Sequence, residues 1–324
     1  MSKYSISQIS SKKVEDFWIN LPQSTVFTHP KVLEEFAKEV HWLAVTKGQE
    51  TQCIWPITLN AKRKPFIPPF SYWQGPMWTK KAYNHPSHKT LSLKTAVYEL
   101  FIETFIDNYG SIKASLHPSI LDVRVFDWWN YTNSEKPKFS IKPRYTAIIG
   151  DLQVNSKPIE KSYRSNRRRE LIKFKKINEL VFFNSSCSEE ELILFYCDTL
   201  KINRSQIEKS LISLLKVVKS GFGWIQTTRK KCDSSLCGLI LILSDEDQAN
   251  LVLNLATTEF RDKGLMAGSI TKALKTTQKK GLCCFDFNGA NSPFRGDDKH
   301  SYGAKPILYF DLEYNIKISD SLLK

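Results

Sequence analysis

Three apolar segments in the second half of the chain constrain the fold more than any other feature of the sequence. They cover residues 223–229, 236–243 and 249–256, and only short turns separate them. Strands joined by short turns run antiparallel, because a parallel pair needs a crossover of a dozen or more residues. The pattern therefore excludes a Rossmann-type order and predicts a mixed, mostly antiparallel sheet flanked by helices, an α+β fold.

The stretch that follows these strands holds most of the candidate functional residues. We predict a helix over 265–280, a buried strand over 282–289, a polar loop over 290–296 and a last strand over 306–311. Polar side chains gather where the buried strand ends. Ligands bind at such strand exits in sheets with flanking helices, so we expect a site there.

The first half of the chain repeats this organisation in a weaker form. A helix begins at His29-Pro30, a hairpin of two strands follows, and a further helix and strand come after an aromatic segment. Two similar units in one chain suggest an internal duplication. We expect one domain over 1–155 and a second over 156–324, with the last strand returning to the first domain. The alternative is one large α/β domain.

Composition narrows the class of protein. A chain of 324 residues that is 41% hydrophobic can bury more than one ordinary core. We find no signal peptide and no apolar run long enough to span a membrane. The seven cysteines are odd in number and scattered, which fits reduced thiols in a cytoplasmic protein. No Cys/His spacing matches a zinc site, so we expect no metal.

A basic helix predicted over 163–176 carries much of the excess charge. The net charge is +14, and residues 161–176 hold eight basic residues and one acid. Arg164, Arg167 and Arg168 are the candidates for binding substrate phosphates, because guanidinium binds phosphate in a bidentate manner. Nucleotides, coenzymes, tRNA and anionic membranes are all suitable partners. The alternative is a solvated basic face.

A glycine turn precedes the helix predicted over 265–280. Arg261, Gly264 and Ala267 follow a strand and open this helix, so the helix N-terminus could hold a pyrophosphate. We assign these residues, with Asn291 of the polar loop, to cofactor binding. The alternative is an ordinary loop with a glycine at the start of a helix.

Three residues near the end of the buried strand are candidates for catalysis. Asp286 lies between two phenylalanines, where a carboxylate is either a general base or a buried structural acceptor. Lys299 could neutralise an oxyanion or a phosphate, and Tyr302 could donate to a leaving group. The alternative for both is a surface turn. Tyr145 and Trp73 lie in aromatic segments that suit a sugar or a base, or else form the core of the first unit.

Four short motifs, in order along residues 23–312, resemble the Fem-type (FemAB-like) branch of the GNAT acyltransferase superfamily. They are Gln74-Gly75-Pro76, Arg164-x-x-Arg167-Arg168, Phe285-Asp286-Phe287-Asn288-Gly289 and Lys299-x-x-Tyr302-Gly303. Asp298 stands where the family has a phenylalanine. The resemblance implies two tandem GNAT-like units with an acceptor cleft between them. It also implies that Lys299 lies near the reaction centre and that Arg164 and Arg167 anchor phosphates.

The resemblance also implies an activity, namely transfer of an acyl group to an amine. We expect an acyl-CoA donor such as acetyl-CoA and a nucleotide-linked amino sugar as acceptor, in the synthesis of a bacterial surface polysaccharide. Backbone N–H groups of strand 249–256 would polarise the thioester. One alternative is an aminoacyl-tRNA-dependent ligase on a peptidoglycan precursor, favoured by the arginine helix. Another is a non-catalytic RNA-binding protein. The lack of a coiled-coil arm favours CoA over tRNA.

Overall fold

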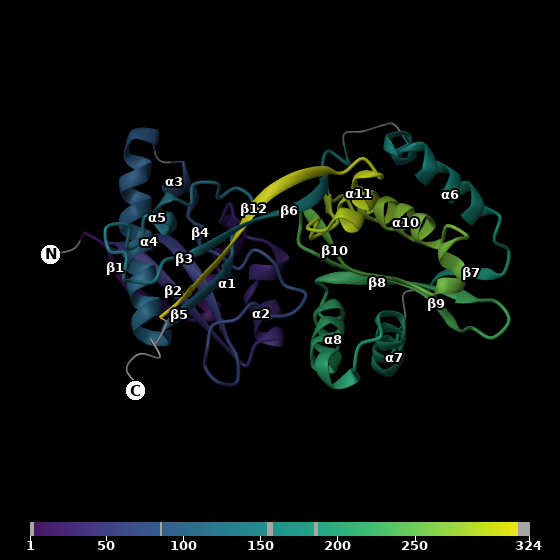
Figure 1. The fold of residues 1–324 in the computed structure, drawn as a ribbon, viewed down its shortest axis with the longest axis horizontal. Coiled ribbons are helices and arrows are strands. Elements are labelled where there is room, and N and C mark those ends of the chain that lie inside the picture. Colours follow the sequence, from purple (N-terminus) through teal and green to yellow (C-terminus); the bar gives the residue numbers. More distant parts are fainter. Residues whose placement is uncertain (1–2, 85, 154–157, 185–186, 317–324) are drawn as a thin grey trace. The chain divides into compact units, whose positions relative to one another are not determined.

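The computed structural model describes residues 3–84, 86–153, 158–184 and 187–316 (Figure 1). Its contacts divide the chain into two compact units. The first comprises the chain up to Arg144 together with the segment that begins at Leu308, and the second is Tyr145–Ile307. The boundary that we predict at residue 155 lies outside the described residues.

The first unit contains a four-stranded antiparallel sheet in the order β1-β2-β3-β4. The strands are β1 (Ser5–Ile9), β2 (Glu39–Lys47), β3 (Glu50–Leu59) and β4 (Met77–Trp78). The expected hairpin is confirmed as β2 and β3, which pair up to Lys47 and Glu50 around the left-handed Gly48. The aromatic segment 66–78 contributes only the two residues of β4 to the sheet.

Helices and one further strand pair complete the first unit. The helices are α1 (Ser11–Glu15), η1 (Trp18–Asn20), η2 (Val26–Thr28), α2 (Pro30–Phe36), α3 (Lys80–Tyr83), α4 (Ser87–Tyr109) and α5 (Arg124–Asp127). Strand β5 (Ser111–Ser115) pairs antiparallel with Asp311–Asn315 of β12 (Lys305–Asn315). Trp55 is 2% exposed and meets four aromatic rings edge-on, so it organises the core of this unit.

The second unit contains a six-stranded sheet segment in the order β6-β11-β10-β9-β8-β7. The strands are β6 (Ser140–Ile149), β7 (Leu180–Asn184), β8 (Gly223–Lys230), β9 (Leu236–Ser244), β10 (Gln248–Ala256) and β11 (Cys284–Asp286). The three strands predicted from short turns are confirmed as β8, β9 and β10, and they pair antiparallel. Strands β10 and β11 are parallel, which the connecting helix between them makes possible.

Helices cover both faces of this sheet (Figure 1). They are η3 (Ile159–Ser162), α6 (Ser165–Lys175), α7 (Glu189–Leu200), α8 (Arg204–Lys219), α9 (Thr258–Arg261), α10 (Leu265–Lys279) and α11 (Pro293–His300). Helices α6 and α10 lie on one face, and α7 and α8 lie on the other. Helix α6 approaches α10 so closely that a Cβ on Gly268 would lie 2.2 Å from the Phe174 ring.

The local prediction for residues 290–296 is wrong. The expected loop is in part helix α11, which begins at Pro293, and proline is favoured in the first helical turn. Helix α8 begins at Arg204 after its N-cap Asn203. Helix α7 has Ser188 as its N-cap, and the Ser188 hydroxyl accepts from the Glu191 backbone N–H at 3.1 Å.

Candidate active site

The parallel pairing of β10 and β11 ends inside the second unit, and the candidate site lies at this end. The pairing covers only three residue pairs and ends at Asn250 and Asp286. Strand β10 continues to Ala256, so its last six residues extend beyond β11. The pairing of β10 with β9 is also irregular between Leu251 and Leu253. Ligands bind outside the carboxyl ends of parallel strands.

Asp286 ends β11 and is fully buried. Its Oδ1 accepts hydrogen bonds from the Thr146 hydroxyl on β6 and from the Asn288 backbone N–H at 2.6 Å. Its Oδ2 has no hydrogen-bond partner among the described residues. Burial raises the pKa of this carboxyl to about 7, although the two hydrogen bonds and Lys299 act in the opposite direction. A carboxyl with such a pKa is able to exchange a proton near neutral pH.

The loop after β11 binds the ammonium group of Lys299. Asn288 has a left-handed backbone with φ of 50°, and its side-chain amide donates to the Leu251 carbonyl of β10 at 3.0 Å. The Lys299 ammonium on α11 donates to the carbonyls of Asn288 and, at 2.6 Å, Gly289. Asp286 binds the backbone N–H of Asn288, and the Asn288 side chain binds the loop to β10. The loop carbonyls in turn bind the Lys299 ammonium. The structure thus links two of the predicted catalytic residues through Asn288.

Tyr302 lies in the core of the second unit. Its ring stacks on Phe287 with centroids 5.6 Å apart and meets Tyr163 edge-on at 5.2 Å. It is fully buried, and its hydroxyl has no hydrogen-bond partner among the described residues. Burial raises the pKa of this phenol well above its ordinary value. These contacts support a packing role, and the assignment of Tyr302 to catalysis stays a prediction.

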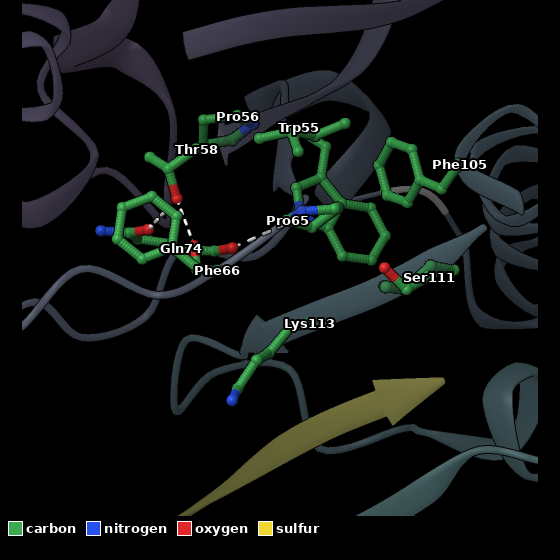
Figure 2. A pocket seen from close by; sticks show the side chains of 11 residues that line it. Trp55, Pro56, Thr58, Pro65, Phe66, Gln74, Phe105, Ser111 and Lys113 are labelled. Carbon is green, nitrogen blue, oxygen red and sulfur yellow. Dashed lines mark hydrogen bonds between the residues drawn. The ribbon is translucent and has the colours of Figure 1, made fainter. Parts of the chain in front are cut away.

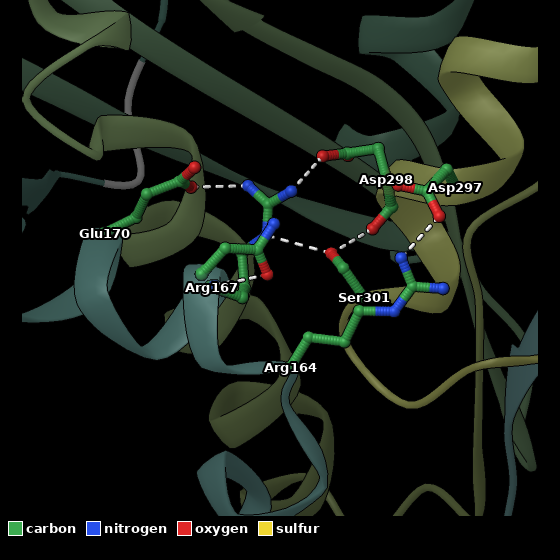
Figure 3. Close-up of polar contacts among 7 residues, drawn as sticks. Arg164, Arg167, Glu170, Asp297, Asp298 and Ser301 are labelled. Atoms are coloured by element: carbon green, nitrogen blue, oxygen red, sulfur yellow. Dashed lines mark hydrogen bonds and ion pairs between the residues drawn. The ribbon is translucent and has the colours of Figure 1, made fainter.

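Arg167 turns inward and ties α6 to α11, as Figure 3 shows. Its guanidinium is 2.5 Å from both Glu170 and Asp298, and its Nε donates to the Ser301 hydroxyl at 2.9 Å. It also lies 4.8 Å from the centre of the Tyr302 ring. All three nitrogens of its guanidinium therefore already serve partners within the protein. Because α11 carries Lys299, Arg167 holds the helix on which a candidate catalytic residue lies.

The two other arginines predicted to bind phosphate are exposed. Arg164 precedes α6 and pairs with Asp297 of α11, with half of its side chain accessible (Figure 3). Arg168 is exposed on α6, and no described carboxylate pairs with it. Of the three, these two could reach a bound phosphate without breaking the buried cluster.

The turn before α10 packs closely against α6. Gly264 is left-handed, with φ of 86°, and a Cβ there would lie 2.2 Å from the Glu170 carbonyl oxygen. Leu265 and Ala267 in the first helical turn are fully buried. The Arg261 Nε donates to the Ala256 carbonyl at 3.2 Å. The close approach of α6 explains the glycine, and the assignment of this turn to cofactor binding stays a prediction.

The remaining predicted residues fall into both units. In the second unit the Asn291 side chain accepts from the Tyr145 N–H at 2.7 Å, so the residue braces the loop after β11. The Tyr145 side chain is 46% exposed. In the first unit Trp73 is buried with a left-handed backbone, and its indole N–H has no hydrogen-bond partner among the described residues.

The Gln74 motif of the first unit lines a small pocket (Figure 2). Thr58 donates to the Gln74 side-chain carbonyl at 3.3 Å, while the Gln74 amide nitrogen has no partner among the described residues. The cavity volume of about 10 Å³ is enough for about one water molecule. This pocket is too small for a substrate.

A larger cavity of about 540 Å³ lies in the second unit beside Ile149, Ile159 and Ile307. None of the predicted site residues lines it. Among the described residues, no three His, Cys, Asp or Glu side chains are grouped to hold a metal ion. No helix in the described ranges is long and apolar enough to cross a bilayer.

Sequence reasoning missed two residues that build the site. Thr146 comes from a strand 140 positions before Asp286, and no local pattern reveals that pairing. Asn250 is the fully buried neighbour of Asp286 across the parallel strands, and its amide nitrogen has no partner in the described part of the chain. An asparagine inside an apolar strand was the available signal for it.

Comparison with known proteins identifies the fold. No protein-family model matches the sequence, and no curated protein matches it. FemX matches with a TM-score of 0.64 at 11% identity, over 95% of this chain and 96% of that one. A tandem GNAT protein from the clavulanic acid biosynthesis pathway matches with a TM-score of 0.55 at 8% identity, over 97% and 98%.

A third structure is the glucosamine N-acetyltransferase region of a fungal multi-domain GH3 β-N-acetylglucosaminidase. It matches with a TM-score of 0.50 at 12% identity, over 97% of this chain and 38% of that one. The chain thus has a Fem-like double-GNAT fold. The resemblance that the sequence indicates is confirmed at the level of the fold.

Proposed function

We propose that the chain is an N-acyltransferase that moves an acyl group from a carrier to the amine of an acceptor. The observation that carries this proposal is the end of the β10–β11 pairing at the buried Asp286, with the Lys299 ammonium anchored on the loop that leaves β11. The double-GNAT fold supports the same reaction class by analogy.

The reaction needs no covalent enzyme intermediate. The amine nitrogen attacks the acyl carbonyl carbon, a C–N bond forms, and the bond from that carbon to the carrier sulfur or oxygen breaks. The amine loses a proton, which a base accepts. The protein contributes by positioning the reactants and by stabilising the oxyanion.

The described residues supply candidates for each of these roles. The backbone N–H groups of β10 beyond Asn250 would polarise the acyl carbonyl. Lys299 would stabilise the oxyanion or the leaving group. Asp286 is fully buried, so it would accept the amine proton through a water molecule at its Oδ2 atom.

The acceptor in this proposal is a nucleotide-linked amino sugar used for a bacterial surface polysaccharide. The structural match to a glucosamine N-acetyltransferase region supports an amino sugar as the group that carries the amine. Arg164, which precedes α6, and Arg168 on α6 are both exposed and would bind the phosphates of the nucleotide.

A second candidate differs in the donor. An aminoacyl-tRNA-dependent ligase acting on a peptidoglycan precursor would use the same attack of an amine on an acyl ester. The observation that favours it is the Glu170 carbonyl oxygen, which lies against the Gly264 turn and would repel the pyrophosphate of acyl-CoA there.

A transfer assay with both donor classes tests the proposal. The protein is incubated with radiolabelled acetyl-CoA and UDP-linked amino sugars, or with charged tRNA and a UDP-linked peptidoglycan precursor. Transfer from acetyl-CoA supports the first candidate, and transfer only from charged tRNA supports the second. RNA binding without any transfer would favour the non-catalytic alternative. Lys299→Met is the inactive variant, and Lys136→Met, at an exposed lysine of the first unit, is its matched control.

A further inference from the structure

Helices α6 and α10 form a strongly basic layer on one face of the second unit (Figure 1). With Lys176 and Lys280, which follow them directly, the two helices carry ten Lys or Arg residues and a single acid, Glu170. The chain as a whole has a net charge of +14, so much of its excess charge gathers here. We call this surface the cationic layer.

Five of these cations lie on the outer side of α6. These are Arg168, Arg169, Lys173, Lys175 and Lys176, which are all exposed. Within the described ranges none of the five forms an ion pair with a carboxylate. By contrast, Arg167 points inward to its own partners, and Lys275 on α10 pairs with Glu160 at 2.6 Å.

An aliphatic side chain lies in the middle of these cations. Ile172 is 56% exposed, whereas Leu171 and Phe174 on the inner side of α6 are buried. Helical spacing places Ile172 on the same face as Arg168 and Lys176, which are four residues away on either side. An exposed isoleucine contributes nothing to a purely ionic contact. Its side chain favours binding only if the partner has an apolar phase that buries it.

Two polyanions fit the charge of the cationic layer, namely RNA and an anionic lipid surface. The large apolar side chain that α6 and α10 expose, within the described residues, is Ile172, and it cannot stack on a base as an aromatic ring would. A cluster of exposed cations beside an exposed aliphatic residue is typical of a polybasic surface that binds anionic lipid. The observations therefore favour the lipid surface.

We propose that the cationic layer docks the protein on an anionic phospholipid bilayer. Arg169, Lys173, Lys175 and Lys176 would lie at the lipid phosphates, and Ile172 would enter the boundary between headgroups and acyl chains. This proposal rests on charge and exposure alone and does not depend on the proposed acyl transfer.

Co-sedimentation with vesicles tests the docking. We expect the full chain to pellet with phosphatidylcholine vesicles that contain phosphatidylglycerol and to remain in solution with phosphatidylcholine alone. Reversing three cations, in R169E/K173E/K176E, should lower the partition coefficient about 100-fold or more, since each cation near an anionic surface contributes about fivefold. Ile172→Asn should lower it about 10-fold.

Matched variants separate this surface from general charge and folding effects. K62E/K64E/K136E makes the same change in net charge at exposed lysines of the first unit, and Leu121→Asn removes an aliphatic side chain that is 59% exposed. For both controls the partition coefficient should stay within about twofold to threefold of the wild-type value. This range includes the long-range effect of the changed net charge.

Three outcomes would overturn the proposal. In the first, the wild type fails to bind anionic vesicles. In the second, the first-unit controls lose as much vesicle binding as the α6 variants. In the third, Ile172→Asn has the same partition coefficient as wild type. Binding of tRNA that displaces the protein from vesicles and is insensitive to Ile172→Asn would assign the cationic layer to RNA instead. Equal melting temperatures of variants and wild type establish that each variant is folded.

Discussion

Replacing Asp286 by asparagine tests the central claim about the candidate site, which is that this carboxyl is buried and has a raised pKa. The asparagine side chain would have the same shape as the native one. Its carbonyl oxygen can accept from Thr146 and from the Asn288 N–H, as Oδ1 does now. Its amide group replaces Oδ2, which has no partner among the described residues. The substitution thus removes the titration and little else.

The sign of the effect follows from the direction of the pKa shift. Burial raises the pKa of the Asp286 carboxyl from 3.8 to about 7, so the folded state keeps a proton that the unfolded state releases. This contribution to stability is fully present below pH 3.8 and is lost as the pH rises through about 7. The total change corresponds to about 4 kcal/mol at most.

Urea unfolding of both proteins at several pH values provides the measurement. The free energy of unfolding of Asp286→Asn, minus that of wild type, should rise by about 3 kcal/mol between about pH 5 and 8. Burial lowers the pKa of His29 and of His117 to about 4, and their titration is common to both proteins and cancels in the difference. A difference that stays flat over this range would refute the assignment of a buried carboxyl with a raised pKa.

Three further predictions concern the residues around this carboxyl. Lys299→Met should lower turnover about 100-fold while leaving the melting temperature within a few degrees, and unchanged turnover would remove the residue from the mechanism. Arg167→Lys should destabilise the protein by about 2 kcal/mol in thermal unfolding, because lysine cannot serve Asp298 and its other partners together; equal stability would show that the cluster is not structural. Gly268→Ala should cost about 1–3 kcal/mol by clashing with Phe174, and a neutral result in the same assay would contradict the close helix packing.

The elements of the second unit could be predicted because their signals are local. Short turns set the antiparallel order of β8, β9 and β10, and apolar periodicity marks the long helices. Helix α11 was missed, although Ser292 followed by Pro293 is a signal for a helix start. Its polar composition concealed it, because few of its residues show the apolar spacing of a buried helix face.

The sequence by itself determined the fold class, the tandem GNAT resemblance and the residue types near the end of β11. The tertiary structure alone decided what those residues touch. It turned Arg167 inward to Asp298, gave Asp286 a partner from β6, and set the backbone of α6 against Gly264. The reason is physical: periodicity and turns act between neighbours in the chain, whereas burial and hydrogen-bond partners depend on segments that lie more than 90 residues apart.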